Sequence, residues 1–188
     1  MKLITPTLET ERLILKRGTL EDYLKVYEYD FTCLRDINGV NERVKYDPKK
    51  IEELVASLED ENALEFIIYE KNLNPVGNIV FDRFNKELNS LEVAINIHPD
   101  SWGKGYAKEA IVEIMRYIFA NLNIDNIVYA YALENKKSMR VAEKLGFEPV
   151  RRYIEFYKKI KKNVKSEECI MSKERFYELY GEKVKWNI

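Results

Sequence analysis

Cysteine and histidine are scarce in this sequence of 188 residues, which contains only Cys33, Cys169 and His98. Two cysteines are too few for a disulfide framework, and we interpret both as reduced thiols of a cytoplasmic protein. One histidine and two distant cysteines do not form a set of metal ligands. We therefore expect no metal, and we interpret His98, which precedes Pro99, as a structural residue of a loop.

Long hydrophobic runs are also missing. No stretch approaches the roughly 18 apolar residues of a membrane-spanning helix, and residues 1–6 lack the apolar core of a signal peptide. The 31 lysine and arginine residues give no excess over the 32 aspartate and glutamate residues, which argues against nucleic acid as the main partner. We expect no membrane partner, no direct nucleic-acid binding and a single domain over residues 1–188, a length that buries roughly 70% of the unfolded surface.

Hydrophobic periodicity predicts alternating strands and helices. Strand patterns lie at 12–16, 64–70, 76–84, 91–97 and 127–133, and a closing pair lies at 150–158 and 167–171. Helices are predicted after Thr19, from Pro48, along the stripe from Ile111 to Leu122, between the cap residues Asn135 and Gly146, and over 173–180. This order indicates an α/β (α+β) fold, with a mixed, mostly antiparallel central sheet flanked by helices and one central crossover helix.

The most informative segment joins the strand at 91–97 to the central helix through a loop that contains Gly103 and Gly105. Glycines let backbone N–H groups converge on one spot, and the following helix adds its own unpaired N–H groups and partial positive charge. Lys104 and Lys108 add mobile positive charge. This combination predicts an anion site, most often for phosphate, although a plain tight turn is the alternative. The third glycine of a dinucleotide fingerprint and the P-loop pattern are both absent.

Three segments together resemble the GCN5-related N-acetyltransferase (GNAT) superfamily, specifically its ribosomal-protein alanine N-acetyltransferase branch. Residues 8–15, Leu-Glu-Thr-Glu-Arg-Leu-Ile-Leu, look like the opening strand of that branch. Residues 97–107, with Trp-Gly-Lys-Gly-Tyr-Ala at their end, resemble the acetyl-CoA loop, and residues 135–147 resemble the second cofactor motif. The resemblance covers about residues 8–175 and implies a GNAT-type sheet splayed between the fourth and fifth predicted strands, 91–97 and 127–133.

The resemblance implies acetyl-CoA as co-substrate. Its pyrophosphate would lie on the loop backbone, and its pantetheine arm would lie in the splay and pair with backbone groups, much as an added strand would. Asn135 is similar to the asparagine of the family that contacts the cofactor arm, although a bare helix cap is the alternative. The expected cofactor-binding residues are Ile97, Trp102, Gly103, Lys104, Gly105, Tyr106, Ala107, Lys108, Asn135 and Ser138.

The implied chemistry is direct attack of a primary amine on the thioester. The backbone N–H of Ile95 is expected to stabilise the oxyanion. Glu92 could accept the amine proton, or it is an ordinary polar strand residue. Ser138 resembles a serine proposed in this branch to assist the leaving thiolate, or it merely belongs to the first helical turn. Many relatives carry a tyrosine acid where this chain has Ala142, which rules out that acid here.

The acceptor is expected to be a protein N-terminal α-amine or a small amine. Specificity for it should lie in residues 33–50 and in the closing hairpin, whose basic run from Arg151 to Lys165 either attracts an acidic partner or is a solvated tip. A homodimer formed through exposed strands is compatible with such a fold. The alternative function is an acetyl-CoA-binding sensor or scaffold without transferase activity.

Overall fold

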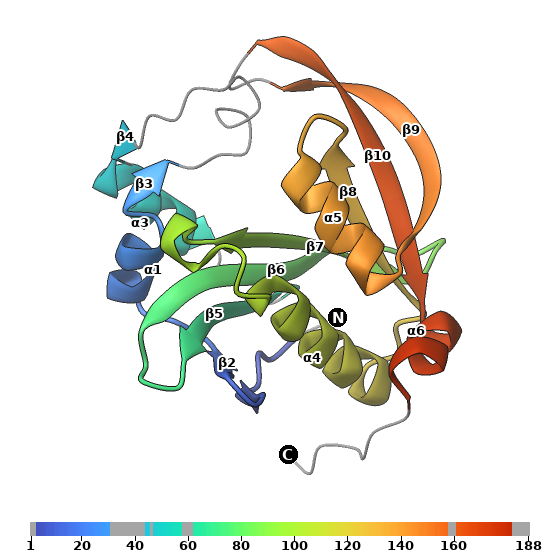
Figure 1. Ribbon diagram of the computed structural model, residues 1–188, viewed down its shortest axis with the longest axis horizontal. Helices are drawn as coiled ribbons and strands as arrows, with labels where there is room; N and C mark the ends of the chain where they lie inside the picture. Colours follow the sequence, from blue (N-terminus) through green and yellow to red (C-terminus); the bar gives the residue numbers. More distant parts are fainter. Residues whose placement is uncertain (1–2, 31–43, 46, 58–61, 158–160, 182–188) are drawn as a thin grey trace.

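The fold is built on one eight-stranded sheet in the order β1-β2-β5-β6-β7-β8-β10-β9 (Figure 1). The computed structural model describes residues 3–30, 44–45, 47–57, 62–157 and 161–181. Neighbouring strands of this sheet are antiparallel except β7 and β8, which are parallel. The predicted mixed, mostly antiparallel sheet is therefore confirmed. The strands are β1 (Leu8–Glu9), β2 (Leu13–Lys16), β5 (Leu64–Glu70), β6 (Pro75–Asn85), β7 (Ser90–Ile97), β8 (Asn126–Ala132), β9 (Glu148–Tyr157) and β10 (Lys162–Ser172), with a separate pair β3 (Tyr29–Asp30) and β4 (Val44–Lys45).

Several helices begin or end at residues that favour those ends. They are α1 (Leu20–Val26), α3 (Pro48–Ser57), α4 (Tyr106–Asn121), α5 (Lys136–Leu145), α6 (Lys173–Tyr180) and the short 3₁₀ helix η1 (Pro99–Ser101). Thr19 and Asp22 form a reciprocal capping box at α1. Gly146 ends α5 with φ of 84°, in the left-handed region that favours glycine. The helix ends predicted at Thr19, Pro48, Asn135 and Gly146 are confirmed.

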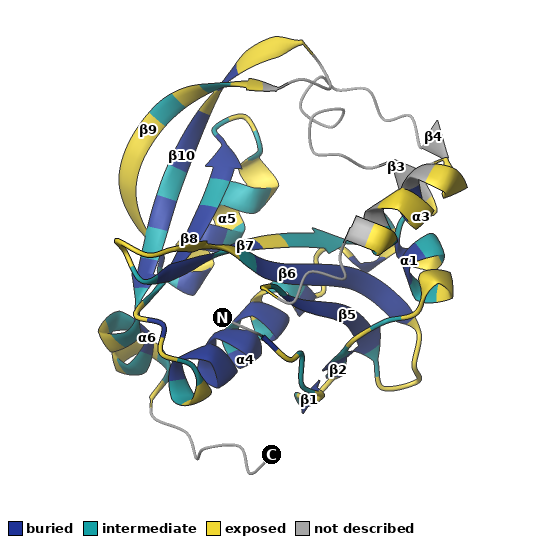
Figure 2. Ribbon diagram, turned by 180° about the vertical axis from the view of Figure 1, so that it is seen from behind, coloured by how far each residue is buried: buried dark blue, intermediate teal, exposed yellow. Residues whose placement is uncertain are grey.

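The sheet is buried on both faces in its first half. Phe66 and Ile68 of β5 belong to the large core that includes Ile114 of α4, whereas Ile67 packs on the other face with Tyr23 of α1. The two-residue alternation of a strand places successive side chains on opposite faces. Helix α4 therefore lies on one face and α1 with α3 on the other, and Figure 2 shows that most of α4 is buried.

The sheet opens between β7 and β8. These strands pair only at Ser90/Asn126, Leu91/Ile127 and Glu92/Val128, although β7 continues to Ile97 and β8 to Ala132. Figure 1 shows β8, β9 and β10 turned away from β5, β6 and β7. The splay expected between the predicted strands at 91–97 and 127–133 is present, and it leaves the second half of β7 without a partner on that side.

Two sequence-based expectations differ from the structure in detail. Strand β9 runs over 148–157, so it begins two residues before the predicted 150–158. Strand β10 runs over 162–172, so it is longer at both ends than the predicted 167–171. Much of β9 is an exposed edge, as Figure 2 shows, so hydrophobic alternation does not mark its ends. The opening strand that the resemblance implies over residues 8–15 is divided in the structure into two short antiparallel strands, β1 and β2. Cys33, most of the predicted acceptor segment and residues 158–160 of the basic hairpin lie outside the described residues.

Candidate active site

The loop between η1 and α4 is shaped by two glycines with positive φ. Gly103 has φ of 78° and Gly105 has φ of 83°, and Gly105 is the residue that caps α4. A Cβ atom at Gly103 would meet nothing within 4 Å, and at Gly105 its nearest neighbour would be Arg12 Nη2 at 3.5 Å. Glycine is thus required here by backbone conformation and not by lack of space.

The loop presents a run of unpaired backbone amides. On either side, the Trp102 amide donates to the Pro99 carbonyl, and the Glu109 amide donates to the Gly105 carbonyl. Within the described chain, no acceptor is found for the six amides from Gly103 to Lys108, and no side chain caps the helix. Free amides at the start of a helix, with its partial positive charge, form an anion site. The predicted site residues Gly103, Lys104, Gly105, Tyr106, Ala107 and Lys108 are thus brought together through their backbone.

The side chains of this loop face other partners. The Lys104 ammonium lies 3.4 Å from Glu70 Oε1, and the Tyr106 hydroxyl donates to the same oxygen at 2.7 Å. The bond from Tyr106 is the main cause that lowers the pKa of Glu70. Lys108 Nζ lies 5.7 Å from the ring centre of Tyr180. The mobile positive charge predicted at Lys104 is therefore paired in this structure.

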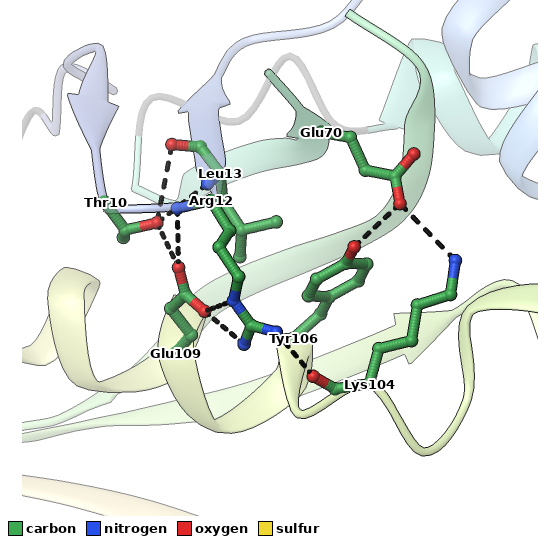
Figure 3. Close-up of polar contacts among 7 residues, drawn as sticks. All are labelled: Thr10, Arg12, Leu13, Glu70, Lys104, Tyr106 and Glu109. Carbon is green, nitrogen blue, oxygen red and sulfur yellow. Dashed lines mark hydrogen bonds and ion pairs between the residues drawn. The ribbon is translucent and has the colours of Figure 1, made fainter. Parts of the chain in front are cut away.

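A second set of contacts ties the loop and α4 to the segment before β2 (Figure 3). Arg12 Nε and Nη2 donate to Glu109 Oε2 at 2.8 and 2.5 Å, and Arg12 Nη1 donates to the Lys104 carbonyl at 2.9 Å. The Thr10 hydroxyl donates to Glu109 Oε1 at 2.5 Å. Burial raises the pKa of Glu109, but the bonds from Thr10 and Arg12 outweigh burial and hold that pKa below its ordinary value. Sequence reasoning gave Arg12 no role, although it lies in the opening motif.

The open edge of β7 points its backbone groups into the splay. The His98 amide donates to the Val76 carbonyl at 2.8 Å, so His98 directs its backbone groups toward β6. Because this direction alternates along an antiparallel ladder, Ile97 and Ile95 direct theirs to the opposite side, where β8 has turned away. The Ile97 carbonyl accepts a bond of 2.7 Å from the Trp102 indole. The geometry thus leaves the Ile95 N–H facing the opening, as its predicted role requires.

The start of α5 forms the opposite wall of the opening. The Asn135 side chain accepts from the Ser138 amide at 3.1 Å, which is the helix-cap contact. Lys137 Nζ lies 3.4 Å from the ring centre of Trp102, so this helix reaches the loop across the splay. The Ser138 hydroxyl lies 2.8 Å from the hydroxyl of Tyr129, a buried residue of β8. Tyr129 was missed from the sequence, where it reads only as one aromatic of a strand.

The remaining candidates are placed as follows. Glu92 lies where the pairing of β7 with β8 ends, and its carboxylate accepts from Arg83 Nη1 at 2.8 Å. Its strand neighbours Leu91 and Val93 face the core that contains α4, so Glu92 faces the other side of the sheet. No described contact joins Glu92 to Ser138. His98 accepts from the Asp100 amide at the start of η1, as expected of a loop residue.

Two absences hold for the part of the chain that the structure describes. Among these residues, no group of three or more histidine, cysteine, aspartate and glutamate side chains is arranged to hold a metal ion. None of the helices described is both long and apolar enough to cross a membrane. Ala142, at the position where many relatives carry a tyrosine, is buried in α5.

Known proteins are similar to this chain in sequence and in architecture. Residues 12–148 match the acetyltransferase (GNAT) domain family. The chain is 27% identical over 152 residues to the uncharacterized N-acetyltransferase p20 of Bacillus licheniformis, a match that spans 76% of this chain and 82% of the relative. It is 30% identical over 141 residues to the uncharacterized N-acetyltransferase YnaD of Bacillus subtilis (strain 168), spanning 73% and 79%.

The fold also matches solved structures. Spermidine N-acetyltransferase from Vibrio cholerae, in complex with CoA and spermine, superposes with a TM-score of 0.71 at 22% identity, over 89% of this chain and 99% of that chain. The finer assignment to the ribosomal-protein alanine branch stays a prediction. Because the family match spans most of the sequence and the fold agrees with it, the chain belongs to the GNAT family of acetyltransferases.

Proposed function

We propose that this protein is an acetyl-CoA-dependent N-acetyltransferase in which a primary amine attacks the thioester directly. One observation carries the proposal: the unpaired amides from Gly103 to Lys108 lie beside a strand edge that opens between β7 and β8. The amides suit a diphosphate, and the open edge suits an extended arm whose own amides pair like an added strand. Acetyl-CoA carries both groups, and the Vibrio cholerae structure contains CoA.

The proposed reaction forms a C–N bond and then breaks the C–S bond, so that CoA leaves as a thiolate. The Ile95 N–H donates to the oxyanion of the tetrahedral intermediate. Glu92 accepts the proton that the amine loses, and the Ser138 hydroxyl, paired with Tyr129, donates a proton to the thiolate. Exchange with solvent then removes the proton from Glu92 and returns one to Ser138, so both groups are restored for the next turnover. A thiol pKa near 8.5 demands only weak acid assistance, so most of the acceleration comes from positioning and desolvation of the amine.

The acceptor we propose is a small cationic amine, with a protein N-terminal α-amine as the alternative. Glu92 forms an ion pair with Arg83 at 2.8 Å, and the charges of Glu92, Asp82 and Glu155, with Glu92 the strongest, raise the pKa of Arg83. Glu92 marks the start of the splay, and carboxylates at this place would attract a cationic acceptor. The Vibrio cholerae relative was solved with spermine.

The cofactor site is tested by thermal unfolding with and without acetyl-CoA. A ligand at 100 times its dissociation constant stabilises the folded state by about 2.7 kcal/mol, which raises the melting temperature by several degrees. Gly105→Glu should abolish this shift, because it places a negative charge and a strained backbone at the anion site. Gly181→Glu is the matched control, since Gly181 also has a positive φ, 71°, and an open environment. An absent shift for folded wild-type protein would refute the site.

The transfer itself is tested by thiol release from acetyl-CoA with spermidine, spermine and a peptide with a free N-terminal alanine. The proposal expects release with the polyamines at a higher kcat/KM than with the peptide. Faster release with the peptide would reverse the acceptor assignment. Binding of acetyl-CoA without release in the presence of any of these amines would favour the sensor or scaffold function instead.

A further inference from the structure

We propose that Arg12 is a positioning residue for the phosphate-binding loop, which it holds so that the loop amides face the diphosphate of acetyl-CoA. This inference rests on the proposed function and names a residue that touches neither the thioester nor the amine in it. Arg12 immediately precedes β2, and its guanidinium reaches Glu109 in the first turn of α4 and the carbonyl of Lys104 in the loop (Figure 3).

The bond to Lys104 fixes one peptide plane of the loop. All peptide bonds described here are trans, and in a trans peptide the carbonyl and the following N–H point in opposite directions. Arg12 Nη1 holds the Lys104 carbonyl at 2.9 Å, so the amide of Gly105 is directed away from Arg12. That amide is one of the six without an acceptor in the described chain. Arg12 therefore sets the direction of a donor at the centre of the anion site.

The bond to Glu109 neutralises a negative charge at the same site. A carboxylate in the first turn of a helix is favourable for the helix but repels a diphosphate bound at that end. Glu109 is ionised at neutral pH, because its hydrogen bonds from Thr10 and Arg12 hold its pKa low. Arg12 donates two bonds to one Glu109 oxygen, and its own amide donates to the other at 3.1 Å. The guanidinium thus neutralises the one acidic side chain of the first turn.

A lysine at position 12 could not make the same contacts as Arg12. The planar guanidinium donates in two directions at once, toward the Glu109 carboxylate and toward the Lys104 carbonyl, whereas an ammonium is a compact point charge. Arg12 also lies with its Cζ 5.0 Å from the ring centre of Tyr106, whose hydroxyl is held by Glu70. The loop is consequently held on one side by the residue that precedes β2 and on the other by the last residue of β5.

The test compares two thioester donors, acetyl-CoA and acetyl-pantetheine, which lacks every phosphate. Arg12→Gln should lower kcat/KM for acetyl-CoA by about tenfold to a hundredfold, the range expected when binding groups are misplaced. It should leave kcat/KM for acetyl-pantetheine unchanged, because that donor does not use the loop amides. Arg12→Lys keeps the charge and is the second variant, to be used if Arg12→Gln does not fold. It should also lower kcat/KM for acetyl-CoA and leave kcat/KM for acetyl-pantetheine unchanged.

Arg175→Gln is the matched control. Arg175 of α6 forms an ion pair with Glu148 at 2.9 Å and donates to the carbonyl of Gly146, another glycine with positive φ, which ends α5 away from the proposed site. The substitution Arg175→Gln should change kcat/KM for acetyl-CoA and for acetyl-pantetheine by the same factor. An equal loss for both donors in the Arg12 variants, or no loss, would overturn the inference. A wild-type enzyme that uses both donors equally well would instead refute the diphosphate site of the proposed function.

Discussion

The hydroxyl of Tyr129 lies 2.8 Å from the hydroxyl of Ser138, although one residue belongs to β8 and the other to the first turn of α5. Tyr129 is buried against Phe147, with ring centres 5.6 Å apart, so its position is set by packing. The pair brings a phenol to the helix whose usual tyrosine position holds Ala142. This phenol reaches the proposed site through Ser138 and not from the helix itself.

Removing this pair should slow the transfer. We expect Ser138→Ala to lower kcat by about tenfold, toward the low end of acid–base effects because the thiol leaves readily. Tyr129→Phe should lower kcat less, since it removes the partner of the donor. Steady-state rates of thiol release measure both. Tyr117→Phe, a buried tyrosine of α4, is the control, and a loss below about threefold for Ser138→Ala would remove the proposed role.

Glu92 should matter more for acceptors that hold their proton tightly. Replacing Glu92 with Gln removes the proposed base, and we expect a loss of about a hundredfold in kcat/KM at pH 7. The loss should shrink as pH rises and should be smaller for an α-amine, whose pKa of about 7.7–8.0 lies below the value of about 10.4 for a lysine-like amine. A pH profile with both acceptors checks this.

The control for this substitution is Glu87→Gln, in the exposed turn between β6 and β7, where the side chain carries no ion pair among those described. The same pH profile for Glu92→Gln and wild type would show that the carboxylate takes no proton. Glu92 would then be only the partner of Arg83.

Trp102 should report the arrival of acetyl-CoA. Its indole bonds to the Ile97 carbonyl and stacks under Lys137 at the place where the pantetheine arm is proposed to enter. We expect the fluorescence of Trp102 to change on titration with acetyl-CoA in a Trp186→Phe background, which leaves one tryptophan in the chain. Titration with acetate is the control. A flat signal at concentrations that raise the melting temperature would place the arm elsewhere.

Glu65 should make the folded state less stable as pH rises toward neutral. Burial raises the pKa of Glu65 from 4.5 to about 7, so the folded protein holds a proton there that the unfolded chain has released. The free energy of unfolding should therefore fall between about pH 4.5 and pH 7, by up to about 3 kcal/mol, and level off above. Asp22 and Glu109 have lowered pKa values, so they lose their stabilising effect below this window.

Denaturation by urea at pH 5 and pH 7.5 measures this effect. Glu65→Gln should remove the difference, because the amide keeps the shape, stays neutral and still accepts from the Tyr23 hydroxyl. Equal pH dependence in the variant and the wild type would assign the slope to another group.

Local signals in the sequence were enough to predict some elements. The side chains at Thr19 and Asn135 and the backbone freedom of Gly146 act within one helical turn, and all three ends are present in the structure. The glycine loop was recognised for the same reason, since its conformation depends on Gly103 and Gly105 themselves.

Contacts between distant segments could not be predicted in this way. Arg12 and Glu109 are 97 positions apart, and nothing in either local pattern indicates the other. Tyr129 and Ser138 are only nine positions apart, but they meet because α5 folds back on β8. Lys104 is an exposed cation in the sequence pattern, and only the fold brings Glu70 beside it. The side-chain partners of the site are therefore properties of the tertiary structure.

The short pairing of β7 with β8 has a consequence for how the molecule opens. Only three residue pairs connect β7 to β8, so backbone hydrogen bonds couple the unfolding of the strands on one side of this junction only weakly to the unfolding of those on the other. The strands β8, β9 and β10 with α5 can then exchange amide hydrogens as one unit, separately from β5, β6 and β7. A co-substrate bound along the opening would act as a ninth strand and couple both units, so amide exchange on either side of the gap should slow together when the ligand is present.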